Sequence, residues 1–428
     1  MTQPGAPWLS LVTLATCFVS ISNATNYDEA KVGTYTLPDP LVMQDGQRVT
    51  TAQQWAQQRR PEIIRLFEEN QYGRCPPKPD DLRFDVFDND PTALDGKAIR
   101  KQITVFFNGK PDSPQMHVLM YLPPSAATRP VPVFLCLSFT SVFQITADPG
   151  VKITTVWDTK KKATSQPSEL MRGRSAKGWP IETVLSRGYG IAFVYYCDIE
   201  PDFAGGLPLG VRALYLKPGE TDVGPDEWGA VAAWGWGLSR AQDYLETDRQ
   251  VDSAHTIIMG HSRLGKTVMW AGARDTRFAM TVASCSGEGG AALSRRDYGE
   301  TVADLNKKFP YQFARNYQKY GEHVDQLPVD SHMLVALMAP RPLYLNTGSE
   351  DRWSDPRGEF LAAVAGSPVY ELLGKKGIGA TEMPPLDTPL LDGDVGYQCH
   401  TGKHEVLASD WDRFLDFADR HLRARQGG

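Results

Sequence analysis

The sequence predicts an α/β fold in which a doubly wound, mostly parallel sheet lies between two layers of helices. Short apolar runs with strand character alternate with segments that carry apolar residues at helical spacing. The later strand runs are apolar throughout, which is typical of strands covered by helices on both faces. The 428 residues contain no repeat or low-complexity tract that would divide the chain, so we expect one elaborated domain.

The expected elements follow from these two patterns. An amphipathic helix is expected over 53–70, interrupted by Pro61 and closed by Gly73. Further helices are expected over 228–247, 264–274 and 405–425. The expected strands are 99–107, 117–122, 131–139, 190–196, 256–259, 280–284 and 343–346. Two long polar stretches, 198–226 and 288–330, are expected to cover the carboxyl edge of the sheet, where ligands bind.

The first residues have the pattern of an export signal. Residues 7–22 are apolar, small residues follow at 22–25, and the stretch is too short for a membrane span. We therefore expect a signal peptide over 1–24, a domain with an N-terminal extension over 27–425, and a secreted or periplasmic protein. The net charge of -6 predicts no surface for nucleic acid.

Cysteine usage limits the covalent and metal chemistry that we expect. Cys17 would leave with the signal, and the remaining odd number excludes a fully paired disulfide framework. Their spacing contains no CxxC pair, so no zinc site is expected. The remaining cysteines are Cys75, Cys136, Cys197, Cys285 and Cys399.

A candidate nucleophile follows the strand run 256–259. Gly260, Ser262 and Gly265 form a turn of the Gly-x-Ser-x-Gly type, and a helical segment begins directly afterwards. Glycine on both sides of the serine removes Cβ atoms that would collide in a sharp turn, which leaves the hydroxyl exposed near backbone N–H groups. The bare motif is common and also occurs in incidental turns. The strand before it and the helix after it favour catalysis.

Candidate partners for Ser262 follow in the order serine, acid, histidine that α/β-hydrolases use. His404 lies in the loop before the last predicted helix and is the expected base, with His400 as a weaker competitor. Asp351 follows the strand at 343–346 and is the favoured acid. Glu288 is the alternative acid at this stage.

The segment 260–266, GHSRLGK, resembles the Gly-x-Ser-Arg-x-Gly-Lys signature of glucuronoyl esterases, the fifteenth carbohydrate esterase family. The resemblance implies an α/β-hydrolase that cleaves esters between 4-O-methyl-glucuronic acid side chains of glucuronoxylan and lignin alcohols. It covers most of the chain after about residue 131. The other similar segments are 228–230, 286–290, 338–342, 351–353 and 402–404.

The resemblance also implies roles for residues around the serine. Arg263 would stabilise the oxyanion, while Lys266, Glu300 and Trp353 would bind the sugar. No metal or organic cofactor is implied, and we expect a monomer that binds its carbohydrate ester without nucleic acid or membrane. The alternatives are an acetyl-xylan esterase or other carboxylesterase, a peptidase of the same fold, and a catalytically silent carbohydrate-binding relative.

Three departures from the family pattern are visible in the sequence. Cys285 stands where many members carry the triad glutamate, so Asp351 is expected to supply the acid, as in bacterial members. The places of a disulfide in fungal members hold His261 and Glu405, and a pairing of Cys285 with Cys399 is a weaker expectation. Residues 137–141, LSFTS, differ from the family pattern Asn-Phe-x-Gly-Asn-His.

Overall fold

The central sheet of this computed structural model, which describes residue 1 and residues 25–423, is doubly wound and mostly parallel. Within these residues nine strands form one sheet in the order β1-β2-β3-β7-β4-β8-β9-β10-β11, and β5 pairs with β6. Strands β7, β4, β8, β9, β10 and β11 run parallel, whereas β1, β2, β3 and β7 pair in antiparallel fashion. The predicted fold class is confirmed. The strands are β1 (Arg83–Ala93), β2 (Ala98–Phe106), β3 (Gln115–Leu122), β4 (Val131–Ser138), β5 (Val156–Asp158), β6 (Ala163–Ser165), β7 (Gly190–Tyr195), β8 (Val251–His261), β9 (Met280–Ser284), β10 (Leu343–Gly348) and β11 (Val395–His400).

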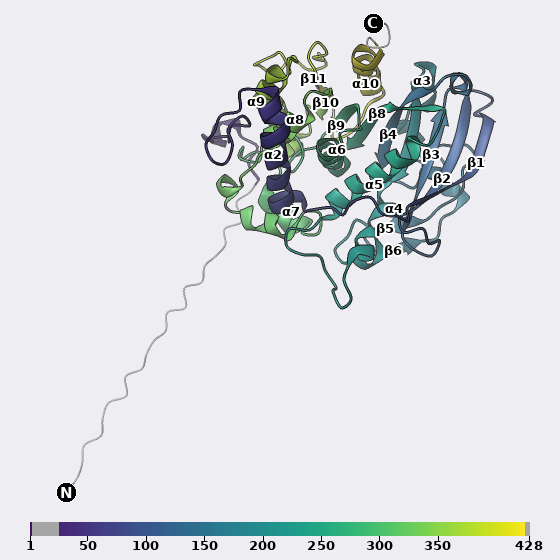
Figure 1. The fold of residues 1–428 in the computed structure, drawn as a ribbon, viewed down its shortest axis with the longest axis horizontal. Helices are drawn as coiled ribbons and strands as arrows, with labels where there is room; N and C mark the ends of the chain where they lie inside the picture. The colour runs from purple at the N-terminus through teal and green to yellow at the C-terminus, as the bar shows by residue number, and fades with distance from the viewer. Residues whose placement is uncertain (2–24, 424–428) are drawn as a thin grey trace.

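Helices cover both faces of the sheet and make a three-layer sandwich (Figure 1). Helices α2, α5, α6, α8 and α9 pack on one face, and α3 and α10 pack on the other. Each face of the sheet has its own hydrophobic core. Along β8, Ile258 packs into the core on the face of α5 and α6, whereas Ile257 and Met259 pack into the core on the face of α3 and α10, as the alternation of a strand requires. The helices are α1 (Ala52–Gln54), α2 (Arg60–Phe67), α3 (Ile181–Ser186), α4 (Tyr196–Ile199), α5 (Ala230–Leu245), α6 (Arg263–Arg274), α7 (Val302–Lys308), α8 (Ser331–Met338), α9 (Pro356–Leu372) and α10 (Ala408–Ala418).

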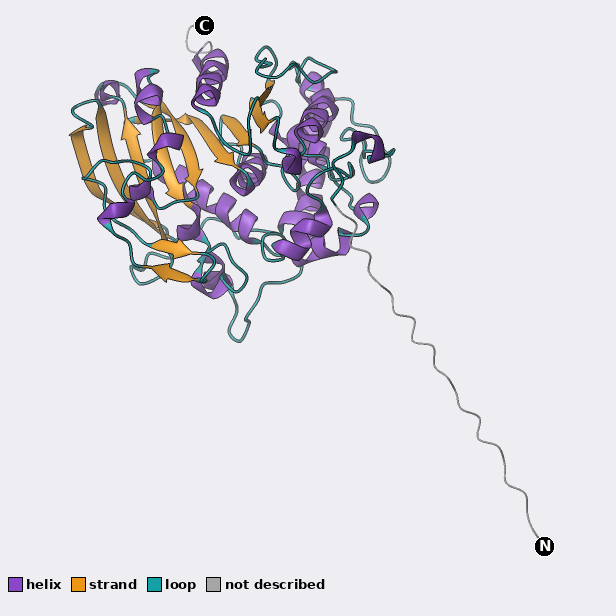
Figure 2. Ribbon diagram, turned by 180° about the vertical axis from the view of Figure 1, so that it is seen from behind, coloured by secondary structure: helices purple, strands orange, loops and turns teal. Residues whose placement is uncertain are grey.

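The sequence prediction lacked the two-stranded β5–β6 pair and two strands of the central sheet, β1 and β11. The edge strand β1 carries charged and exposed residues, and β11 contains polar residues that are nevertheless buried. Strand β11 ends at His400, and the last helix begins at Ala408 rather than at residue 405. His404 therefore lies in a loop between a strand and a helix. Figure 2 shows the sheet and its covering helices from the opposite side.

The predicted N-terminal helix is also corrected in detail. The chain is helical from α1 to Tyr72, because π-helical turns at Trp55–Arg59 and Glu68–Tyr72 flank α2. Pro61 does not interrupt it: the proline is the second residue of α2 and follows directly after the π-helical turn Trp55–Arg59. Gly73, with a φ of 86°, ends the helix as predicted.

The long stretches 198–226 and 288–330 contain short helical turns, and the second also contains α7. Both stretches reach the carboxyl ends of the parallel strands, as the contacts described below show. The expected signal peptide lies outside the described residues. Among the described helices, none has the length and apolar character that crossing a membrane requires.

Candidate active site

Ser262 lies at a sharp turn between β8 and α6. Its backbone has a φ of 59° and a ψ of -129°, a strained conformation for a residue other than glycine. A Cβ atom at Gly260 would lie 2.1 Å from the carbonyl oxygen of Leu264, and one at Gly265 would lie 2.9 Å from that of Ser284. Both glycines are therefore required where the strand, the turn and the helix approach one another.

The spacing of the second glycine differs from the Gly-x-Ser-x-Gly pattern. Leu264 stands two residues after Ser262 and is fully buried, while Gly265 stands three residues after it. Gly265 is where α6 comes close to Ser284 of β9, so glycine is needed at this position, one residue later than the pattern predicts.

His404 and Asp351 meet at the carboxyl ends of β11 and β10. The Nδ1 atom of His404 lies 2.6 Å from Oδ2 of Asp351. Ser262 and His404 line the same cavity of ≈ 440 Å³. The geometry suits a base held in one tautomer by a carboxylate, with its other nitrogen free to face the serine.

The charge on Asp351 is maintained by several donors. Burial works to raise its pKa, but the hydrogen bond and the charge of His404, together with hydrogen bonds from Ser354 and the Cys285 thiol, hold the pKa of Asp351 below its usual value. The carboxylate is therefore ionised at neutral pH. That state is required to stabilise an imidazolium on His404.

The two alternatives from the sequence occupy other positions. Glu288 is buried and accepts hydrogen bonds from Ser294, at 2.6 Å, and Tyr317, at 2.9 Å. Burial raises the pKa of Glu288 to about 7. His400 faces Asp410, with 3.1 Å between Nδ1 and Oδ2. Neither alternative belongs to the contact that orients His404.

Arg263, the residue after Ser262, is held in place by an ion pair. Its guanidinium contacts the carboxylate of Asp202 and lies 4.7 Å from the ring centroid of Phe309. Burial works to lower the pKa of Arg263, but Asp202 outweighs this effect and raises it. Asp202 is itself fixed by the hydroxyl of Tyr311 at 2.8 Å and the amide of Gln312 at 3.0 Å. A fixed positive charge thus lies next to the serine.

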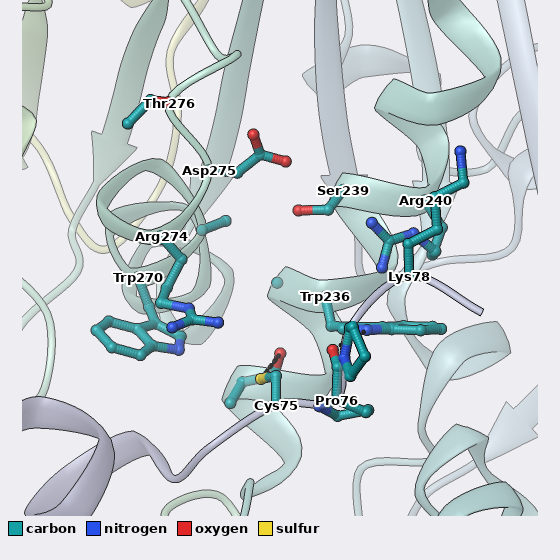
Figure 3. A pocket seen from close by; sticks show the side chains of 14 residues that line it. Cys75, Pro76, Lys78, Trp236, Ser239, Arg240, Trp270, Arg274, Asp275 and Thr276 are labelled. Carbon is teal, nitrogen blue, oxygen red and sulfur yellow. Dashed lines mark hydrogen bonds between the residues drawn. The ribbon is translucent and has the colours of Figure 1, made fainter. Parts of the chain in front are cut away.

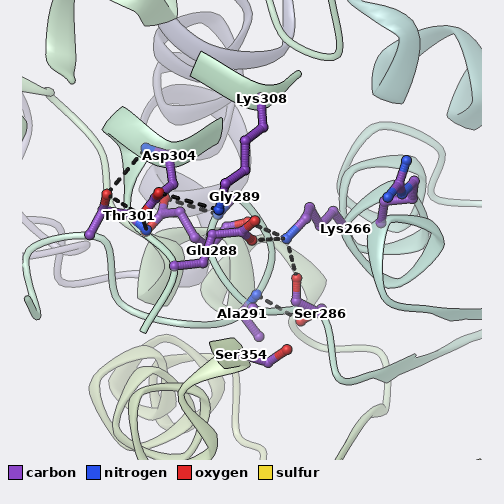
Figure 4. A network of polar contacts seen from close by, with 12 residues as sticks. Lys266, Ser286, Glu288, Gly289, Ala291, Thr301, Asp304, Lys308 and Ser354 are labelled. Atoms are coloured by element: carbon purple, nitrogen blue, oxygen red, sulfur yellow. Dashed lines mark hydrogen bonds and ion pairs between the residues drawn. The ribbon is translucent and has the colours of Figure 1, made fainter. Parts of the chain in front are cut away.

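Lys266 occupies the next turn of α6 and is buried (Figure 4). Its ammonium donates to the carbonyl oxygens of Ser286, at 2.8 Å, and Glu288, at 2.6 Å, and pairs with Glu300 at 3.1 Å. All three N–H donors are engaged, so a sugar hydroxyl would have to replace one of these partners. Glu300 has lone pairs left with which to accept from the same sugar.

Trp353 forms another wall of the cavity. Lys308 of α7 lies over its ring, with 3.8 Å between the ammonium nitrogen and the ring centroid. Both residues line the cavity with Glu300 and Phe309. An aromatic wall combined with converging polar groups is the arrangement that a sugar ring requires.

Sequence reasoning missed several residues of this site. Asp202, Lys308 and Phe309 lie in the two long stretches, where no local pattern distinguishes them from other loop residues. In the sequence, His261 stood out only because fungal family members have a disulfide cysteine at its position. In the structure its ring packs against that of His404, with 4.6 Å between centroids. Burial, with the neighbouring His404, lowers the pKa of His261 to about 3, so the ring is neutral.

The expected pairing of Cys285 with Cys399 is wrong. Both cysteines are free, as are the other cysteines in the described part of the chain. Cys285 is instead buried against Asp351, with which its thiol hydrogen-bonds. Cys285, Asp351 and His404 are also the described residues whose ligand atoms gather closely enough to hold a metal ion.

A second cavity of ≈ 260 Å³ lies between α5, α6 and the segment that begins at Cys75 (Figure 3). Its basic side chains are already paired, Arg240 with Asp243 and Arg274 with Glu68. Its walls lack a histidine and a serine with a base beside it. The candidate catalytic groups Ser262, Asp351 and His404 thus all line the cavity at Ser262.

Comparison with known proteins agrees with this geometry. The family model for fungal glucuronyl esterases matches residues 224–374. A carbohydrate esterase, MZ0003, from an unknown prokaryotic organism is 47% identical over 93% of this chain and 92% of its own. The structure of a glucuronoyl esterase from Solibacter usitatus is 50% identical, with a TM-score of 0.89 over 92% of this chain and all of its own. One from Teredinibacter turnerae is 33% identical, with a TM-score of 0.78 over 93% of this chain and 92% of its own. The chain therefore belongs to the glucuronoyl esterases of carbohydrate esterase family 15.

Proposed function

We propose that this protein hydrolyses the ester between the carboxyl group of a (4-O-methyl-)glucuronic acid side chain of glucuronoxylan and an alcohol of lignin. The observation that carries the proposal is one cavity that joins Ser262, His404 and Asp351 to a wall suited to a sugar ring. The name of a relative from Schizophyllum commune, 4-O-methyl-glucuronoyl methylesterase, supports the same substrate class; it is 28% identical over 86% of this chain.

Ser262 is the proposed nucleophile and His404 the proposed base. His404 takes the hydroxyl proton through Nε2 while its Nδ1–H remains bonded to Asp351, and the serine oxygen attacks the ester carbonyl. The protonated imidazole then gives its proton to the departing alcohol, which leaves an acyl-enzyme. Water, activated by the same His404, releases the uronic acid and restores the serine.

Arg263 is the proposed stabiliser of the oxyanion. Its backbone N–H belongs to the first turn of α6, and its guanidinium supplies a full positive charge that Asp202 already holds in place. Because that charge is fixed before substrate binds, little reorganisation is needed when the tetrahedral intermediate forms.

Lys266, Glu300 and Trp353 are the proposed sugar contacts. Trp353 offers an apolar face for the ring, and Glu300 accepts from ring hydroxyls. Lys266 holds Glu300 in position, since a carboxylate this buried requires a partner.

We further propose a signal peptide over residues 1–24, a single domain over 27–425 and a monomer that acts outside the cytoplasm. An enzyme that cleaves a plant polymer must reach it outside the cell. N-terminal sequencing of the exported protein tests the cleavage site. Size-exclusion chromatography coupled to light scattering measures the molar mass and tests whether the protein is a monomer.

The decisive experiment measures hydrolysis of benzyl glucuronate by the wild type and by Ser262→Ala. We expect turnover by the wild type and a loss of about 10⁴-fold or more in kcat for the variant, because the nucleophile is removed. Acetylated xylan serves as the competing substrate. Acetate release without hydrolysis of benzyl glucuronate would instead assign an acetyl-xylan esterase, and failure of a fluorophosphonate probe to label Ser262 would assign a silent binding protein.

A further inference from the structure

Three potential metal ligands converge at the carboxyl ends of neighbouring strands. Cys285 follows β9, Asp351 follows β10 and His404 follows β11, and one ligand atom of each lies within 4.8 Å of the others. We propose that these three side chains form an inhibitory binding site for zinc(II), in which the bound ion switches the esterase off.

The donor set suits zinc. A thiolate, a carboxylate and an imidazole are the ligand types that zinc binds, and three protein ligands with one open position are the usual arrangement at an accessible site. Magnesium and calcium prefer oxygen ligands throughout, so this set disfavours them. The hydroxyl of Ser354 lies 3.4 Å from Nδ1 of His404.

The geometry requires a small adjustment. In a tetrahedral site with bonds of 2.0–2.3 Å, neighbouring ligand atoms lie about 3.3–3.7 Å apart. The contact of 2.6 Å between His404 Nδ1 and Asp351 Oδ2 must therefore lengthen. The Cys285 sulfur, which lies within 4.8 Å of the other two ligand atoms, must move closer to them. The side chain of His404 is 40% exposed, so it has the freedom to move.

An ion reaches the cluster through the substrate cavity. Cys285, Asp351 and His404 all line that cavity. Arg263, Lys266 and Lys308 also line it and oppose a divalent cation, whereas Glu300 favours one. The cations of the cavity are already paired with Asp202, Glu300 and Asp304, which limits their repulsion.

Binding releases one proton. The Cys285 thiol becomes a thiolate bound to zinc and loses its proton to solvent, as a zinc-bound cysteine must. The proton on Nδ1 of neutral His404 moves through water to Nε2 as Nδ1 binds the metal. No electron is transferred and no other bond changes.

Inhibition follows from the tautomer. With Nδ1 bound to zinc and Nε2 protonated, His404 has no lone pair with which to accept the proton of Ser262. Its hydrogen bond with Asp351 is lost at the same time. This inhibitory consequence rests on the proposed esterase function, whereas the binding of metal does not.

The first test measures metal binding without using activity. Cobalt(II), a spectroscopic substitute for zinc, is titrated into the wild type, Cys285→Ala and Cys399→Ala, and the sulfur-to-cobalt charge-transfer band is recorded. We expect the band in the wild type and in Cys399→Ala, a matched control in which another buried thiol, two strands away on β11, is removed. We expect no band in Cys285→Ala. A wild type without the band, or a Cys285→Ala variant that retains it, overturns the proposal.

The second test measures hydrolysis of benzyl glucuronate with zinc(II) and after EDTA, each variant being compared with its own metal-free rate. We expect reversible loss of at least about tenfold in the wild type. Loss of a residue that only supports a metal ligand weakens metal binding by roughly 10–100-fold. Cys285 is a proposed ligand itself, so the zinc concentration for half inhibition should rise by more than this in Cys285→Ala. Equal sensitivity of both proteins places the inhibition elsewhere and refutes the site. A metal-free wild type without turnover contradicts the proposed function alone, since the cobalt titration still decides the binding.

Discussion

Replacement of Asp351 by asparagine tests which carboxylate orients His404. The amide preserves the size of the side chain but removes the negative charge 2.6 Å from Nδ1 of His404. An amide N–H that faces the ring also favours the wrong tautomer, with the proton on Nε2. The variant is therefore expected to fold normally and to lose most of its turnover.

The size of the loss follows from the lost attraction between imidazolium and carboxylate. At 2.6 Å and an effective dielectric constant of about 20, Coulomb's law gives roughly 6 kcal/mol. His404 is 40% exposed, and solvent screening reduces this to about 3–5 kcal/mol. At about 1.4 kcal/mol for each tenfold change, kcat should fall by roughly 10²–10⁴-fold, while KM changes little.

The assay is steady-state hydrolysis of benzyl glucuronate by the wild type, Asp351→Asn and Glu288→Gln, with thermal melting as the control for folding. Glu288→Gln is the matched variant because it also converts a buried acid to its amide, but at Ser294 and Tyr317 rather than at His404. We expect its kcat to stay within about tenfold of the wild type. A severe loss in Glu288→Gln together with an active Asp351→Asn would refute the reasoning.

Four further predictions concern the surroundings of the triad. Arg263→Met should lower kcat by about 10²–10³-fold, and a change in KM alone would argue against its action on the oxyanion. Lys266→Met leaves Glu300 buried without a partner and should lower the free energy of unfolding by about 3–5 kcal/mol, and the double variant Lys266→Met/Glu300→Gln should recover part of that loss in denaturant titrations. Trp353→Ala should raise KM for benzyl glucuronate by about tenfold through loss of the aromatic face. Burial raises the pKa of Glu359 from 4.5 to about 8, so its contribution to stability is fully present below pH 4.5 and is lost as the pH rises through 8. Glu359→Gln should therefore flatten this fall, by on the order of 3–5 kcal/mol at pH 8, in unfolding curves measured from pH 5 to 8.

The parallel core of the sheet was predictable because its strands are buried on both faces. Runs such as those of β4 and β7 are apolar throughout and stand out against their surroundings. The strand β11 was not predictable in this way, since Gln398 and His400 look like loop residues. They are buried because Asn346, 52 residues before Gln398, and Asp410 in the following helix α10 satisfy them, and these partners meet them only in the folded chain.

The reactive residues of the site were predictable for a different reason. Ser262 lies in a local pattern, and Asp351 and His404 follow in a fixed order after strands, so local signals sufficed to propose them as a set, and the structure brings them to one cavity. Asp202 had no such signal. Its contact with Arg263 joins residues separated by 61 positions, through a loop whose path depends on packing over the whole edge of the sheet.

The position of Cys285 explains how this chain accommodates an acid on the later strand. The ends of β9, β10 and β11 are adjacent, so a carboxylate after β9 or after β10 lies at the same edge as the loop that carries His404. With Asp351 on β10, a second carboxylate at residue 285 would place two like charges together and raise the pKa of one of them. A thiol avoids this repulsion, fills the space and donates a weak hydrogen bond to Asp351. The same substitution adds a sulfur ligand beside a carboxylate and an imidazole. A cysteine in place of a carboxylate at residue 285 thus both accommodates Asp351 as the proposed acid and supplies a ligand of the proposed zinc site. Cys285→Ala should separate these two roles, because it removes metal binding while the contact of 2.6 Å between Asp351 and His404 remains.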